Sequence, residues 1–161
     1  MKKLTLITIL ATVAFAQMPK ADADSVWKYI HETSPYWNWK TINDKGPLYK
    51  NNRKPHAPIL STYVNDIAYE SIKKGERTLP YGSLIVKENY KDNKFKMLGI
   101  KYKKKSYDIK SGDWYWIKVK PSGEVKKAGV IKGCIDCHAH ARAADFVHTG
   151  HDFEYPLPKK K

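Results

Sequence analysis

Cysteine is scarce in this sequence. The 161 residues contain only two cysteines, Cys134 and Cys137, and these lie close together. Such a pair cannot build the multi-disulfide framework that holds many small secreted domains together. The two cysteines must therefore be interpreted from the residues beside them.

The sequence also lacks an apolar run long enough to cross a bilayer. Its longest such stretch, residues 4–14, is about half the roughly 20 residues that a spanning helix needs. Two lysines precede it and a small-x-small pattern ends it, which predicts a secretory signal peptide over residues 1–16. Cleavage is expected between Ala16 and Ala23, giving a periplasmic protein with no integral membrane segment. An uncleaved leader that tethers the protein to a membrane is the alternative.

Acidic residues are few compared with basic ones. There are 16 Asp and Glu against 30 Lys and Arg, so the formal net charge is +14 at pH 7. Residues 1–16 carry two lysines and no acid, so the mature chain keeps +12. This charge suits an acidic redox partner or an anionic surface. Because the lysines are spread along the chain and export is predicted, we expect a solvated basic surface and no nucleic-acid partner.

The chain after the leader suits one small domain, which we place at residues 24–155, followed by a disordered tail at residues 156–161. Strands are predicted from β-branched and aromatic runs at residues 59–64, 83–90, 95–103, 113–119 and 124–131. Helices are predicted after a cap at Asp24 or Ser25, after a cap at Asn65 and from the cysteine pair through Ala144. The fold class is therefore α+β, a mostly antiparallel β-sheet with short flanking helices and a C-terminal helix that begins at the cysteines.

The strand at 113–119 is apolar on both faces. Trp114 and Trp116 point one way, while Tyr115 and Ile117 point the other. Helices can cover one face, and a cofactor or a second subunit is a natural cover for the other. A homodimer formed through this sheet is expected.

Residues 134–138 read Cys-Ile-Asp-Cys-His, which is the attachment pattern of c-type haem. Two thiols three residues apart lie on one helical turn and can reach the two vinyl groups of a haem, and His138 then points at the iron. A redox-active Cys-x-x-Cys does not need the histidine, and a structural zinc site needs four ligands, of which three are local. We predict one covalent haem c held by Cys134 and Cys137, with His138 as the iron ligand.

Several other side chains could hold a metal. His140 is two positions from His138 and so faces away from the same iron. Asp145, His148, His151 and Asp152 have spacings that could bind zinc or copper, although a polar helix end is the commoner explanation.

Two residues are alternatives for the second axial position of the iron. His56, in a proline-flanked loop, could be a sixth ligand or a distal hydrogen-bond donor, and Met97 could be a sixth ligand. The ordinary interpretations are a loop residue for His56 and a core residue for Met97.

A set of short motifs occurs along the chain in a characteristic order. They are Trp27-Lys28-Tyr29-Ile30, Pro55-His56-Ala57, residues 61–65, residues 82–90, residues 112–116, Ala128-Gly129, residues 134–138 and residues 145–147. With these motifs the sequence resembles the cytochrome P-460 and cytochrome c′-beta family over nearly the whole mature chain.

The resemblance implies a mostly antiparallel β fold, commonly a homodimer, and a pentacoordinate haem whose open distal side meets small nitrogen species. Members of the P-460 type oxidise hydroxylamine and carry a lysine covalently joined to the haem, and the matching position here is Lys87. Members of the c′-beta type bind nitric oxide in an apolar pocket and lack this cross-link.

The sequence departs from the family pattern in two places. Residues 145–148 read Asp-Phe-Val-His where members commonly read Asp-Tyr-Val-Phe. P-460 enzymes also place a carboxylate on the strand after the lysine, whereas residues 95–102 contain no acid. Because hydroxylamine oxidation requires a base near the iron, we expect a haem protein that binds nitric oxide or a related ligand. An oxidoreductase acting on hydroxylamine or nitric oxide is the alternative, and an electron carrier with both axial positions filled is a third.

Overall fold

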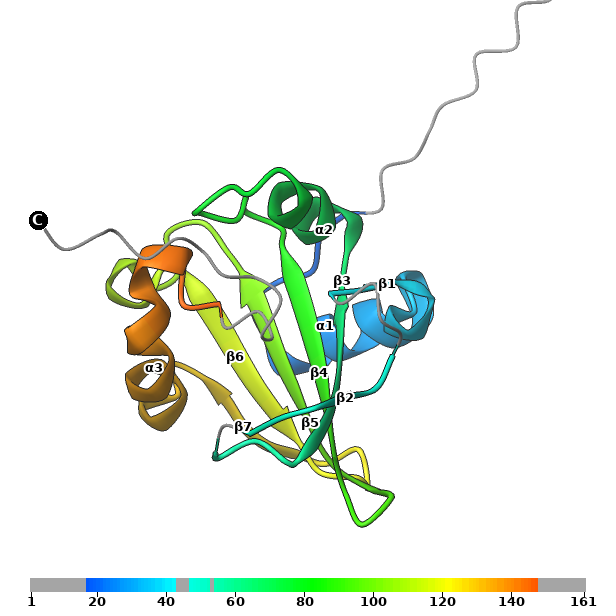
Figure 1. The fold of residues 1–161 in the computed structure, drawn as a ribbon. Coiled ribbons are helices and arrows are strands. Elements are labelled where there is room, and N and C mark those ends of the chain that lie inside the picture. The colour runs from blue at the N-terminus through cyan, green and yellow to red at the C-terminus, as the bar shows by residue number, and fades with distance from the viewer. Residues whose placement is uncertain (1–16, 43–46, 53, 148–161) are drawn as a thin grey trace, which may run out of the picture.

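The computed structural model describes residues 17–42, 47–52 and 54–147 (Figure 1). The elements in chain order are α1 (Ala23–Lys28), a π-helical turn (Tyr29–Thr33), a 3₁₀ turn (Tyr36–Asn38), β1 (Lys40–Thr41), β2 (Tyr49–Lys50), β3 (Ile59–Val64), α2 (Asp66–Lys73), β4 (Leu84–Lys91), β5 (Lys94–Lys103), a 3₁₀ turn (Ile109–Ser111), β6 (Trp114–Val119), β7 (Val125–Gly129), α3 (Lys132–His138) and a 3₁₀ segment (Ala139–Ala144). The predicted signal peptide and tail lie outside the described residues. Within those residues, no helix is long and apolar enough to cross a membrane.

In the described part of the chain, seven strands form one sheet. The strand order is β1-β3-β4-β5-β6-β7, and β2 pairs with the other half of the same edge of β3. Every pairing is antiparallel. The longest strands, β4 and β5, form the centre, and short helices flank the sheet (Figure 1). The predicted α+β fold with a mostly antiparallel sheet is confirmed.

One face of the sheet, here called the α1 face, is covered by the N-terminal helix. Val26 and Ile30 of the helical segment pack in one cluster with Leu84, Val86 and Ile117 of the central strands. The strand residues alternate with residues that point to the opposite side, as a pleated strand requires. The α1 face is therefore a closed apolar layer.

The opposite face, here called the α3 face, is covered by α2 and α3. Ala68 and Ile72 of α2 share a buried cluster with Trp114 and Trp116 of β6, and Ile135 of α3 packs against it. Figure 1 shows α3 beside the β6–β7 end of the sheet. The α3 face therefore has two helical covers with a stretch of sheet between them.

The aromatic strand β6 is buried within a single chain. Trp114 is fully buried, Trp116 is 4% exposed and Tyr115 is 5% exposed. The expectation that this strand leaves an apolar face in water is wrong, because α1 covers one side and α2, α3 and their neighbours cover the other. Dimerisation stays a prediction, but β6 does not support it.

The N-terminal helix begins earlier than predicted. Asp22, rather than Asp24 or Ser25, is the cap, and its carboxylate accepts a hydrogen bond from the backbone N–H of Ser25 at 2.8 Å. The cap of α2 is the predicted Asn65, whose Oδ1 accepts from the Ala68 N–H at 3.1 Å. Both caps satisfy backbone N–H groups that have no partner inside the helix.

The C-terminal helix is shorter than predicted. It begins at Lys132 and ends at His138, and the chain then continues as a 3₁₀ segment with a break at Ala141. Asp145 and Phe146 follow with positive φ angles of 56° and 59°. The alanines here favour a helix, yet the tighter turn and the left-handed pair direct the chain back toward His138.

Candidate functional site

A pocket lies between α3 and the middle of the α3 face. The space inside it that no protein atom fills is about 840 Å³, part of which is open to solvent. The lining residues are Ile42, Pro55, His56, Thr62, Ile85, Lys87, Met97, Gly99, Ile100, Lys101, Trp116, Ile117, Lys118, Gly133, Cys134, Cys137, His138 and Val147. All four predicted site residues, Lys87 and the three of the Cys-x-x-Cys-His motif, line this one pocket.

His138, the last residue of α3, is held in one orientation. Its side chain is buried, and its Nδ1 lies 2.7 Å from the carbonyl oxygen of Phe146. A carbonyl can only accept, so Nδ1 carries the proton and donates. The ring also packs edge-on against Trp116, with 4.9 Å between ring centroids. Because Nδ1 is engaged, Nε2 is the nitrogen that would bind a metal, an arrangement common among metal-ligating histidines.

Cys134 and Cys137 are both free thiols that are partly exposed to the pocket. They lie one turn apart on α3, on the side that lines the pocket. Burial raises the pKa of the Cys134 thiol, and the nearby Lys118 only partly opposes this effect. The geometry brings the two sulfurs and the His138 ring to the same wall.

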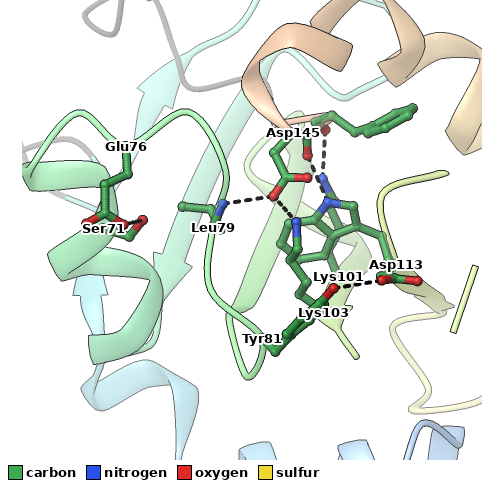
Figure 2. A network of polar contacts seen from close by, with 10 residues as sticks. Ser71, Glu76, Leu79, Tyr81, Lys101, Lys103, Asp113 and Asp145 are labelled. Atoms are coloured by element: carbon green, nitrogen blue, oxygen red, sulfur yellow. Dashed lines mark hydrogen bonds and ion pairs between the residues drawn. The ribbon is translucent and has the colours of Figure 1, made fainter. Parts of the chain in front are cut away.

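The backbone that receives the His138 hydrogen bond is fixed by a buried polar network (Figure 2). The Asp145 carboxylate forms an ion pair with Lys103 and accepts from the Leu79 N–H at 3.0 Å. The Asp145 carbonyl accepts from the indole N–H of Trp114 at 2.8 Å. Asp145 therefore fixes the sharp turn at Asp145 and Phe146, here called the corner, which agrees with the commoner interpretation of a polar helix end rather than with a zinc or copper ligand.

The other members of that suggested metal set, His148, His151 and Asp152, lie outside the described residues. Among the described residues, no group of three or more His, Cys, Asp or Glu side chains could hold a metal ion. His140 is exposed and does not line the pocket, as its position two residues after His138 predicts. The zinc interpretation gains no support from the described part of the chain.

Lys101 of β5 is a pocket residue that the sequence did not reveal. It is 7% exposed, and its Nζ donates to the same Phe146 carbonyl at 2.7 Å. The Nζ atom also lies 4.1 Å from the ring centroid of Trp114 and 4.6 Å from that of Trp116. Burial lowers the pKa of Lys101 well below its ordinary value, while Asp145 opposes this shift. A contact across 45 residues to a backbone atom leaves no local sequence pattern.

Lys87 of β4 projects from the α3 face into the pocket. Its partner on β5 is Gly99, so no side chain occupies the neighbouring position. Burial lowers the pKa of Lys87 to about 8, although the attraction of Cys137 raises it. A lysine with such a pKa is partly neutral at physiological pH and is nucleophilic in that form.

His56 and Met97 also line the pocket. His56 Nδ1 lies 3.1 Å from Asn89 Oδ1, and its ring centroid is 6.2 Å from that of His138. Asn89 lies on β4 two residues after Lys87, so the loop with His56 is tied to the same strand. Met97 is partly exposed in the lining, whereas a core position was the ordinary expectation. Both residues are thus better placed near the site than the sequence indicated.

The pocket lining contains no Asp or Glu among the described residues. Glu88, the acid nearest in sequence to Lys87, points to the opposite side of β4, where Tyr36 and Tyr90 donate to its carboxylate at 2.8 and 3.0 Å. The described pocket lining as a whole, and not only the strand after Lys87, therefore lacks an acidic residue.

Comparison with known families identifies the family of this chain. Residues 33–149 match the family model described as cytochrome P460. The chain belongs to the cytochrome P460 family. No curated protein matches the sequence significantly. Membership of this cytochrome family implies that the protein binds haem.

The pocket of this cytochrome P460 fits a haem in its donors and its charge. It supplies two thiols, a histidine anchored through Nδ1, apolar walls and lysines without acids, which suits a group with two propionates. A Cβ added at Gly99 would meet only one atom within 4 Å, the Lys87 carbonyl oxygen at 3.9 Å. The part of the pocket beside Lys87 and Gly99 is therefore open space that a flat group could occupy.

Proposed function

We propose that the protein is an exported, periplasmic cytochrome with one covalent haem c and an open distal iron site that binds nitric oxide or a related small nitrogen species. The observation that carries the proposal is the convergence of Cys134, Cys137, His138 and Lys87 in one largely apolar pocket that lacks a carboxylate among its described lining residues.

Each of these residues has a separate task in the proposal. Cys134 and Cys137 would hold the haem through thioether bonds, and His138 would bind the iron through Nε2. A bound haem supplies an iron that takes up small diatomic ligands and exchanges single electrons. Ile85 and Met97 keep part of the pocket apolar, which limits water near the ligand.

An oxidoreductase acting on hydroxylamine or nitric oxide is the second candidate. One observation favours it: Lys87 lies in the pocket with a pKa lowered to about 8, as a lysine that bonds to the haem edge would require. The described pocket lining offers no Asp or Glu to collect protons from hydroxylamine. Ligand binding is therefore the better-supported activity.

Optical spectra of the haem-loaded protein test both candidates. The ferrous protein should be high-spin and should change its spectrum on addition of nitric oxide. A strongly red-shifted band in the reduced protein that disappears in Lys87→Ala would establish the cross-link and favour the oxidoreductase. Low-spin iron in both redox states would contradict an open site, and His56→Ala and Met97→Ala would then identify which side chain fills it.

A further inference from the structure

We propose that Lys101 acts on the iron through His138: by donating to the Phe146 carbonyl oxygen that holds His138, it weakens the electron donation of His138 to the iron. The inference rests on the proposed function, since it takes His138 as the axial ligand of a bound haem.

The Phe146 carbonyl oxygen receives two donors at the same distance. His138 Nδ1 and Lys101 Nζ each lie 2.7 Å from it. A carbonyl oxygen has two lone pairs and can accept both bonds, but the two donors share its electron density. A strong bond from Nδ1–H raises the basicity of a metal-bound histidine. A second donor on the same acceptor weakens that effect, so the His138 ring stays closer to a neutral imidazole.

The position of Lys101 is costly to maintain for packing alone. The residue is 7% exposed, and its Nζ lies over the rings of Trp114 and Trp116. A buried ammonium group loses hydration, and a protein with an apolar residue of similar size at such a site is often no less stable. Lys101 retains N–H donors in either protonation state, so its bond to the carbonyl does not depend on its charge.

The neighbouring Lys103 has a different partner, which separates the two roles. Lys103 forms the ion pair with the Asp145 carboxylate and so holds the corner in place. Gly112 packs against the same corner, where an added Cβ would lie 3.0 Å from the Phe146 ring. The carbonyl position is therefore fixed independently of Lys101, and removing Lys101 should change the acceptor strength more than the geometry.

The test uses the haem-loaded protein with Lys101→Met. Resonance Raman spectra of the ferrous protein should show the iron–histidine stretching band at higher frequency than in the wild type. The equilibrium constant for reducing the iron should fall roughly tenfold, about 59 mV for a one-electron couple. Lys101→Arg keeps a donor at this site and should restore the wild-type band. If Lys101→Met does not fold, Lys101→Gln should give a smaller shift in the same direction.

Lys118→Met is the matched control for charge. Lys118 also lines the pocket, but it forms no hydrogen bond to Phe146 among the described contacts. Its loss should lower the reduction potential and leave the iron–histidine band unchanged. An unchanged band in Lys101→Met, or an equal shift in Lys118→Met, would overturn the role of Lys101 but not the proposed function. Absence of an iron–histidine band in the wild type, or its survival in His138→Ala, would instead overturn the proposed ligand and with it the proposed function.

Discussion

Gly112 and the Asp145-Phe146 corner show how single residues orient His138 from outside the pocket. Gly112 has φ +73°, and an added Cβ would lie 3.0 Å from the Phe146 ring and 3.1 Å from Asp145 Oδ1. The corner itself uses two positive φ angles at residues that are not glycine, a conformation that persists only where surrounding contacts stabilise it. Close packing by Gly112 is one of those contacts.

Gly112→Ala should therefore be clearly more destabilising than Gly75→Ala. The two glycines have almost the same φ, +73° and +72°, but a Cβ at Gly75 would meet nothing within 4 Å. We expect a loss of about 1 kcal/mol in the free energy of unfolding for Gly75→Ala, from backbone strain alone. We expect about 2–4 kcal/mol for Gly112→Ala, where a steric clash is added. Urea unfolding measures both, and equal losses would show that Gly112 does not support the corner.

The lowered pKa of Lys87 predicts a pH-dependent stability in the haem-free chain. Between about pH 8 and the ordinary value of 10.5, the folded chain binds fewer protons at Lys87 than the unfolded chain. The free energy of unfolding therefore rises with pH across this window. Below about pH 8 Lys87 is charged in both the folded and the unfolded chain, so the free-energy cost of burying its charge is fully present. Lys87→Met should remove that cost and raise the stability at pH 7 by on the order of 1 kcal/mol.

Denaturation of the haem-free wild type and Lys87→Met at pH 7, 8.5 and 10 measures this effect. The difference in free energy of unfolding between the two proteins should shrink as the pH rises. A constant difference would mean that Lys87 is solvated and does not point into the pocket. Lys96→Met, at an exposed position of β5, is the control and should show no such trend.

The sequence predicted the site residues that form one contiguous motif. Cys134, Cys137 and His138 form one contiguous motif, and their shared helical turn follows from spacing alone. Lys101 could not be found this way, because its contact is with a backbone carbonyl 45 residues along the chain. The sequence named His56 only as one alternative for the second axial position, because its hydrogen bond to Asn89 joins residues far apart in the chain. Tertiary contacts of this kind depend on the register of the sheet, which no local pattern states.

At the scale of elements, the strands were the most predictable. The predicted ranges locate β3 to β7 within about two residues. Most side chains of β3 and β6 are buried, as their runs of β-branched and aromatic residues indicate, whereas β7 is half-buried only at its two ends. The end of α3 was not predictable. An alanine-rich segment favours a helix, whereas the structure has a 3₁₀ segment that leads into the corner holding His138. The shape of this segment is therefore set by the contacts that hold His138 rather than by local helix propensity.

The pairing of β4 with β5 predicts that Gly99 keeps the pocket open. Gly99 lies opposite Lys87, and a Cβ there meets only the Lys87 carbonyl oxygen, at 3.9 Å. Gly99→Ala should therefore retain haem, whereas the longer side chain of Gly99→Leu should fill this open space and reduce the haem content several-fold. The ratio of haem absorbance to protein measures the loading, and circular dichroism checks the fold. Full loading of a folded Gly99→Leu would show that haem does not reach this part of the pocket.

At the scale of the whole molecule, the sheet separates two apolar layers, and the pocket interrupts only the α3 layer. Because β6 is buried in the single chain, any dimer must use another surface. Family resemblance still predicts a homodimer. Sedimentation of the haem-loaded protein at micromolar concentration should show a dimer, and a monomer at all concentrations would contradict this prediction. Trp116→Ala should leave the association state unchanged, because its side chain is 4% exposed and cannot contact a partner directly.

Covalent attachment of one haem through Cys134 and Cys137 is the claim on which the rest depends. Intact-mass spectrometry of the denatured protein, produced in a periplasm with haem-attachment machinery, tests it most directly. The wild type should have the mass of the mature polypeptide plus one haem, and the thioether-bound haem should be lost when both cysteines are replaced by alanine. A wild-type mass equal to that of the bare polypeptide would contradict it, as would haem that stays covalently bound when Lys87 and both cysteines are all replaced by alanine.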